Sequence, residues 1–143
     1  MPLLSDKDRK TLMGMFAQEL VEPVKIVYFG QEIACQYCKE TQAILEEVAG
    51  LSDKIELEIN NFVIDKEKAD AMGVDKIPAT VLLGGGKDYG VRFFGIPSGY
   101  EFTSLIQDII VVSKGQAEFS PEALAMIARI TQPVHIQVYI TPT

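Results

Sequence analysis

One stretch of the sequence decides the fold: residues 23–48 read PVKIVYFGQEIACQYCKETQAILEEV. The short apolar run at 24–29 predicts a buried strand. The two cysteines of the chain, Cys35 and Cys38, follow a few residues later. A helical pattern then covers 39–48, with Gly50 as a suitable C-cap. The stretch therefore predicts a strand, a cysteine pair and a helix that starts beside that pair.

The spacing of the two cysteines indicates a redox-active pair. Residues three apart in a helical turn bring their α-carbons within disulfide reach, at roughly 5–6 Å. The positive end of the helix dipole favours the thiolate of Cys35, and the thiolate is the nucleophile in disulfide exchange. Cys38 lies one turn further in, which suits the resolving role. We therefore predict Cys35 and Cys38 as the catalytic residues of a thiol–disulfide oxidoreductase whose redox-active disulfide needs no other cofactor.

Composition and charge exclude several other classes. A chain of 143 residues is long enough to bury one core of ordinary size. The net charge of −7 argues against nucleic acid as a partner, because phosphate neutralisation needs clustered Lys and Arg. No segment approaches 18 consecutive apolar residues, and the N-terminus lacks the apolar stretch of a signal peptide. We expect no membrane association and a cytoplasmic location, where a close cysteine pair is more often redox-active or metal-binding than structural.

The rest of the chain predicts an α/β unit. A helix after Ser5 precedes it, and Gly84-Gly85-Gly86 predicts the turn of a closing hairpin. From Pro23 onward the predicted order is strand, helix, strand, helix, strand, strand and helix, at 24–29, 39–48, 55–63, 65–72, 79–83, 90–94 and 100–112. This order matches the thioredoxin-like fold, a three-layer α/β/α arrangement with a mixed central sheet and CxxC at a helix N-terminus.

Ile77-Pro78 is the second predicted feature of the site. The dipeptide comes roughly 40 residues after Cys38 and directly before a strand. In the thioredoxin fold a proline at this place takes the cis peptide bond and faces the dithiol. The backbone of Ile77 is then free to pair with an extended substrate segment. We predict Ile77 and Pro78 as substrate-binding residues, together with Gln36 and Tyr37 between the cysteines.

The sequence resembles the protein disulfide oxidoreductases of thermophilic archaea and bacteria, glutaredoxin-like proteins built from two tandem thioredoxin-fold units. The resemblance rests on CQYC at 35–38, IPAT at 77–80, GVRFFGIPSGYEF at 90–102 and YITPT at 139–143. It implies protein substrates with thiols or disulfides, a thioredoxin-reductase-like flavoprotein as electron partner, and a thermophilic source. One departure matters: many thioredoxins carry a buried Asp in the strand before the dithiol, whereas 24–29 holds no acid. The proton acceptor for Cys38 is thus unassigned.

The tail after residue 114 predicts the opening of a second unit. Ser120-Pro121-Glu122 is a strong helix start, and 133–140 alternates as a strand does. Pro133-Val134-His135-Ile136 also repeats the Pro-Val-x-Ile pattern that begins at Pro23. We expect 1–114 to be a thioredoxin-fold unit with an extra N-terminal helix, and 115–143 to be the linker, helix and first strand of a truncated second unit. The chain would then be the N-terminal part of a longer protein, with a cysteine directly after Thr143 and another three residues later.

Alternative interpretations of the cysteine pair stay open. The unit could be a peptide-binding module with little turnover, or a glutathione-dependent glutaredoxin. Tyr37 before Cys38 fits a glutaredoxin, but Gln36 replaces the usual Pro and a basic site for the tripeptide's carboxylates is lacking. The pair could also be structural, or half of a zinc site. Tetrahedral zinc needs four ligands, and His135 lies about 100 residues away on another segment, so we expect no metal.

Overall fold

The computed structural model describes residues 2–141, and within them the chain forms a four-stranded mixed sheet. Its order is β2-β1-β3-β4, with β1 parallel to β2 and antiparallel to β3, and with β3 antiparallel to β4. The strands are β1 (Val24–Gly30), β2 (Ile55–Asn61), β3 (Ala79–Gly84) and β4 (Lys87–Phe94). All four were predicted, and the β3–β4 hairpin is confirmed. β2 ends earlier than predicted, at Asn61, and β4 begins earlier, at Lys87.

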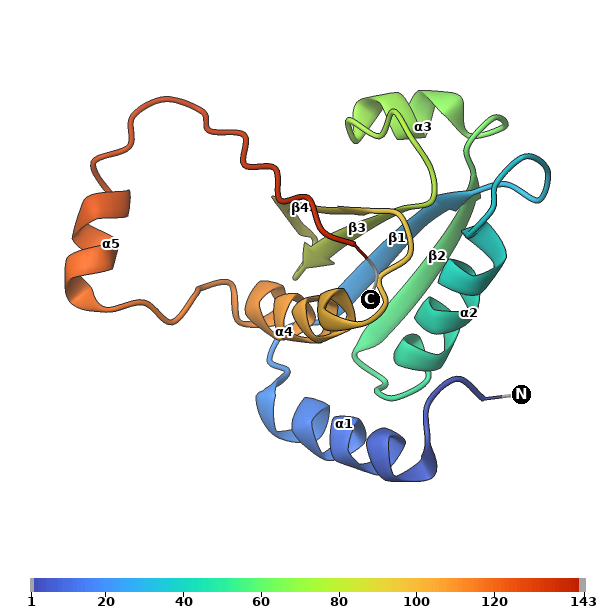
Figure 1. The fold of residues 1–143 in the computed structure, drawn as a ribbon. Helices are drawn as coiled ribbons and strands as arrows, with labels where there is room; N and C mark the ends of the chain where they lie inside the picture. The colour runs from blue at the N-terminus through green and yellow to red at the C-terminus, as the bar shows by residue number, and fades with distance from the viewer. Residues whose placement is uncertain (1, 142–143) are drawn as a thin grey trace.

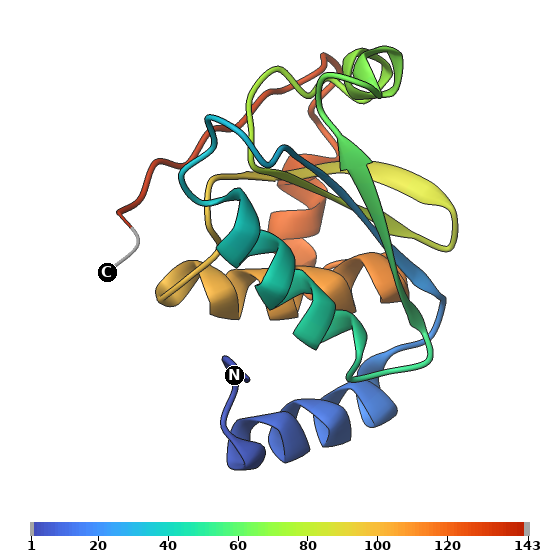
Figure 2. The same ribbon diagram turned by 90° about the vertical axis from the view of Figure 1, so that its right-hand side faces the viewer.

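Helices cover the sheet on both faces (Figures 1 and 2). The main unit has α1 (Asp6–Glu19), α2 (Cys38–Ala49), α3 (Lys66–Ala71) and α4 (Tyr100–Lys114). α2 and α4 pack on one face with α1 beside them, and α3 lies against the other face. The predicted helix after Ser5 is confirmed as α1. Ser5 is its N-cap, and its hydroxyl accepts a hydrogen bond from the Asp8 N–H at 3.1 Å.

Strand β1 is buried on both faces, which makes it the structural centre of the unit. Its alternate side chains divide between two apolar clusters. Ile26 and Tyr28 face α2 and α4, whereas Val27 and Phe29 face α3. Burial of each such aliphatic or aromatic side chain contributes about 1.5–3 kcal/mol. The loop that carries the cysteines therefore starts from the most firmly held strand of the sheet.

The tail differs in part from its prediction. Helix α5 (Pro121–Ile127) forms where expected, with Ser120 as its N-cap, but none of its described side chains is buried. Residues 133–140, predicted as the first strand of a second unit, pair with no strand in the described part of the chain, and their place in such a unit stays a prediction. A strand needs a neighbour for its N–H and C=O groups, and none is supplied here. Pro142 and Thr143, the rest of the predicted strand end, lie outside the described residues.

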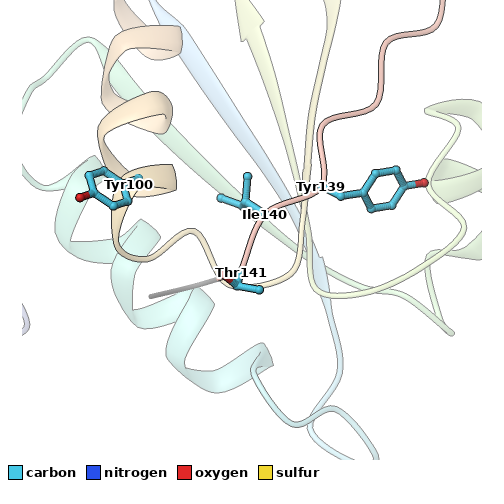
Figure 3. Close-up of a pocket in the computed structure, with 4 residues that line it drawn as sticks. All are labelled: Tyr100, Tyr139, Ile140 and Thr141. Carbon is cyan, nitrogen blue, oxygen red and sulfur yellow. The ribbon is translucent and has the colours of Figure 1, made fainter.

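The end of the tail passes the start of α4. There Tyr139, Ile140 and Thr141 line, with Tyr100, an open cavity of about 540 Å³. Figure 3 shows Ile140 between the two tyrosines, whose rings point in opposite directions. Among residues 2–141, no helix has the length and apolar character required to span a bilayer.

Candidate functional site

The loop between β1 and α2 carries the cysteine pair. It begins after Gly30 and makes a tight turn, in which the Gln31 side-chain amide donates to the Ile33 carbonyl at 2.6 Å. Ala34 has a φ of 58°, a left-handed conformation that costs an L-residue roughly 1–2 kcal/mol. Backbone strain of this kind is concentrated at functional sites. The strained residue directly precedes Cys35.

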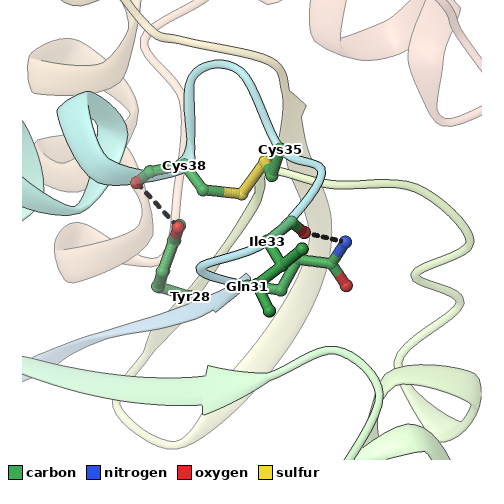
Figure 4. Close-up of a disulfide and its surroundings, with 5 residues drawn as sticks. All are labelled: Tyr28, Gln31, Ile33, Cys35 and Cys38. Carbon is green, nitrogen blue, oxygen red and sulfur yellow. Dashed lines mark hydrogen bonds between the residues drawn. A yellow bond between two sulfur atoms is a disulfide. The ribbon is translucent and has the colours of Figure 1, made fainter.

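Cys35 and Cys38 form a disulfide, with their α-carbons 5.5 Å apart (Figure 4). Cys38 is the first residue of α2 and is only 3% exposed, whereas Cys35 is partly exposed. The helix therefore begins at the second cysteine, one residue before the predicted 39–48, and Cys38 opens its first turn rather than lying one turn inside it. Cys35 lies in front of the helix N-terminus, where backbone N–H groups lack intrahelical acceptors. Helix N-termini in general favour the thiolate form of a reduced cysteine.

The two residues between the cysteines are both at the surface. Tyr37 is the N-cap of α2 and is 43% exposed. Its hydroxyl accepts a weak hydrogen bond from the Gln36 side-chain amide at 3.3 Å. Within residues 2–141 the Tyr37 side chain makes no capping bond to the helix. An exposed aromatic ring and an amide thus lie beside the disulfide, where an incoming polypeptide can contact them.

Ile77 and Pro78 lie at the same end of the sheet as the cysteine loop. Ala79 pairs with Phe29, so β3 begins beside the end of β1. The peptide bond between Ile77 and Pro78 is cis, and the Pro78 carbonyl accepts from the Gly95 N–H at 2.8 Å. Pro78 is buried and Ile77 is partly exposed. The antiparallel pairing therefore places two motifs that are roughly 40 residues apart in the chain at the same end of the sheet.

Tyr28 is a part of the site that sequence reasoning missed. Its side chain is 2% exposed, and its hydroxyl donates to the backbone carbonyl of Cys38 at 2.8 Å (Figure 4). Burial raises the pKa of Tyr28 to about 12, so the phenol stays protonated and remains a donor. The available signal was a phenol inside an apolar run, because a buried tyrosine hydroxyl usually finds a partner. The sequence alone does not name that partner.

Two cavities of the described chain lie away from the cysteines. Besides the cavity at Tyr139, a cavity of about 240 Å³ lies between the N-terminal segment, α2 and the start of α4. Glu47 lines it and accepts hydrogen bonds from the N–H groups of Leu3 and Leu4. No group of three or more His, Cys, Asp or Glu suited to a metal ion occurs within the described residues. Of the two cysteines, Cys35 is partly exposed and Cys38 is buried.

Comparison with known proteins identifies the family. No protein-family model matches the chain. A probable thioredoxin from Methanothermobacter thermautotrophicus is 33% identical over 75 residues, which are 52% of this chain and 82% of that protein. This chain belongs to the thioredoxin family.

Two longer proteins match this thioredoxin-family chain over nearly all of its length. An alkyl hydroperoxide reductase protein of Pseudomonas aeruginosa is 26% identical over 136 residues, 95% of this chain and 24% of that protein. The crystal structure of a protein disulfide oxidoreductase from Aeropyrum pernix is 25% identical with a TM-score of 0.83, covering 96% of this chain and 60% of that one. The chain thus spans about a quarter of the length of the first curated relative. These matches confirm the predicted thioredoxin-like fold and the resemblance to protein disulfide oxidoreductases.

Proposed function

We propose that this chain exchanges disulfides with protein substrates through Cys35 and Cys38. The observation that carries the proposal is a disulfide between one accessible and one buried cysteine at the start of α2. In the reduced protein the Cys35 thiolate attacks a substrate disulfide, forms a mixed disulfide and releases one substrate thiolate. The Cys38 thiol then loses its proton, and its sulfur attacks Sγ of Cys35. The Cys35–Cys38 bond forms, the second substrate thiolate leaves, and two electrons have passed to the substrate.

We further propose that Gln36, Tyr37, Ile77 and Pro78 contact the substrate. Support comes from their common location at the end of the sheet where β1 ends and β3 begins. The backbone before a strand start can pair with an extended polypeptide in the manner of an added strand. The exposed Tyr37 ring can pack on the apolar side chains of such a segment.

The proposed electron partner is a thioredoxin-reductase-like flavoprotein. The resemblance to protein disulfide oxidoreductases supports this partner. The similarity to the alkyl hydroperoxide reductase protein of Pseudomonas aeruginosa is compatible with it. A cytoplasmic location also belongs to the proposal, because reducing compartments favour catalytic over structural cysteine pairs. A thermophilic source remains part of the resemblance and is tested by the melting temperature.

An insulin-reduction assay tests the proposed activity. With dithiothreitol as reductant, the wild type should accelerate insulin precipitation, and Cys35→Ser should abolish that acceleration. Cys38→Ser should instead accumulate a mixed disulfide with the substrate on non-reducing gels. Absence of acceleration by the wild type would reject the enzyme and favour a peptide-binding module. Strict dependence on glutathione would favour a glutaredoxin. Faster alkylation of Cys38 than of Cys35 at pH 6–7 would reverse their assigned roles.

For the tail, we propose that residues 115–143 belong to a second thioredoxin-fold unit. The Ser-capped helix α5 supports this proposal, as do the alternating exposed side chains of Val134, Ile136 and Val138. Matches that extend over only 24% and 60% of longer proteins are also compatible with it. The test is to read the gene beyond codon 143 and then to map protease-resistant units in its full product. A second unit without residues 115–143 in its resistant core would contradict the proposal.

A further inference from the structure

The first turn of α2 is tied to the central strand by a buried hydrogen bond. The Tyr28 hydroxyl donates to the Cys38 carbonyl at 2.8 Å, and both residues are almost fully buried. The first bond of the helix is accepted one residue earlier, where the carbonyl of the N-cap Tyr37 receives the Thr41 N–H at 3.0 Å. The Tyr28 bond is therefore an additional constraint on the backbone of Cys38.

Tyr28 itself is held in place from several sides. Its backbone lies in β1, where it pairs with Ile59 of β2 and with Thr80 of β3. The Asn60 side-chain amide donates to the Tyr28 carbonyl at 3.2 Å. Gly30 leaves room for the phenol, because an added Cβ there would lie 1.9 Å from the Tyr28 hydroxyl oxygen. The hydroxyl is thus a fixed point of the sheet, to which the start of α2 is fastened.

We propose that Tyr28 is a positioning residue for the resolving cysteine, holding the backbone of Cys38 where its sulfur can attack Sγ of Cys35. The inference rests on the proposed disulfide exchange and deepens it. In the resolving step the Cys38 thiol gives up its proton and forms the bond to Cys35, while the bond between Cys35 and the substrate breaks and the substrate leaves as a thiolate. Tyr28 acts on this step through the backbone of Cys38 and takes no proton. The first attack involves only Cys35. The Tyr28 hydroxyl bonds to Cys38 instead.

The separation of the two steps makes the inference testable. Reduced protein is mixed with 5,5′-dithiobis(2-nitrobenzoic acid), which releases a coloured thiolate at each step. The fast release reports attack by Cys35, and the slower release reports resolution by Cys38. In Tyr28→Phe we expect the first rate to stay within about twofold of wild type. The second rate should fall about five- to tenfold, the effect that one lost hydrogen bond supports.

Two controls separate positioning from a general loss of stability. Tyr89→Phe removes a phenol hydroxyl from a tyrosine that is 42% exposed in β4. Ile109→Val trims a fully buried side chain of α4 and lowers stability without touching Cys38. Both variants should keep both rates of the wild type. If Tyr28→Phe folds poorly by circular dichroism, Gly30→Ala is the second variant, because its methyl group displaces the same phenol.

The outcomes distinguish the inference from the proposed function. A wild type that releases no coloured thiolate, or only one per protein, refutes the proposed exchange whatever Tyr28 does. A wild type that releases two, with an unchanged second rate in Tyr28→Phe, overturns the positioning role alone. Equal slowing of both rates, or equal slowing in Ile109→Val, overturns it as well, since either result reduces Tyr28 to a general stabilising residue.

Discussion

Gly30→Ala tests whether Tyr28 occupies the space that the glycine leaves at the end of β1. An ideal Cβ at residue 30 would lie 1.9 Å from the Tyr28 hydroxyl oxygen and 2.5 Å from its Cζ atom. Favourable non-bonded contacts lie near 3.5–4.0 Å, so the methyl group and the phenol cannot share this space. Tyr28 is 2% exposed, so the methyl group can displace its phenol only by disturbing the core.

Two opposing effects decide the size of the change. Replacing glycine where the backbone is unstrained stabilises a protein by about 0.4–1 kcal/mol, and Gly30 is not among the described glycines with positive φ. Against this gain stand overpacking, at about 1–3 kcal/mol, and loss of the Tyr28–Cys38 hydrogen bond, at about 0.5–1.5 kcal/mol. The clash prevails, and we expect Gly30→Ala to lower the free energy of unfolding by about 2 kcal/mol.

The assay is a double-mutant cycle by urea denaturation of the oxidised protein. Tyr28→Leu removes the distal ring atoms that the new methyl group would meet. In that background Gly30→Ala should cost almost nothing, which gives a coupling energy of about 2 kcal/mol. Gly14→Ala in α1 is the matched control, because no described atom lies within 4 Å of its added Cβ. It should raise stability by about 0.5–1 kcal/mol.

Either of two results would contradict this placement of the phenol. If Gly30→Ala costs the same with and without the Tyr28 ring, the phenol is not the obstacle. If Gly30→Ala stabilises the wild-type protein as Gly14→Ala does, the described position of Tyr28 is wrong.

Three further changes test other contacts of the fold. Desolvation acts to raise the pKa of Glu47, but the N–H groups of Leu3 and Leu4 and the charge of Arg9 outweigh it and lower that pKa. The ionised Glu47 carboxylate therefore stabilises the fold above the pKa of the unfolded state, and this contribution is lost as the pH falls through the pKa of the folded state. Glu47→Gln should lower the melting temperature at pH 7 but hardly at pH 2.5. Equal losses at both pH values would contradict this. Burial raises the pKa of Asp108, which makes its charged form destabilising as pH rises through the folded pKa. Asp108→Asn should therefore raise the melting temperature at pH 7 and leave it unchanged at pH 2.5, and no gain at pH 7 would count against the described burial. Gly84→Ala would place a Cβ 1.8 Å from the Val112 carbonyl oxygen of α4, which is backbone and cannot swing away, so we expect a loss of about 2–4 kcal/mol in urea denaturation. An unchanged midpoint would show that β3 and α4 are further apart.

The sequence by itself determined the order of the elements and the location of the cysteine pair. The apolar run at 24–29, the CxxC spacing and the glycine triplet before residue 87 are local signals. Each constrains the backbone over a few residues, through periodicity or turn chemistry, and does so before any tertiary contact exists. Their order was enough to predict the thioredoxin-like fold, which the structure and the comparisons confirm.

The tertiary structure alone decided how these parts meet. The pairing of Phe29 with Ala79 brings Ile77-Pro78 to the end of the sheet where the cysteine loop begins. The Tyr28 bond to Cys38 depends on how α2 packs across the sheet, and the alternating residues 133–140 pair with no strand among residues 2–141. A local pattern states what a segment can bury or pair, but hydrogen bonds between segments form only when both partners are in place. Partners of that kind are separated along the chain, and folding in three dimensions selects them.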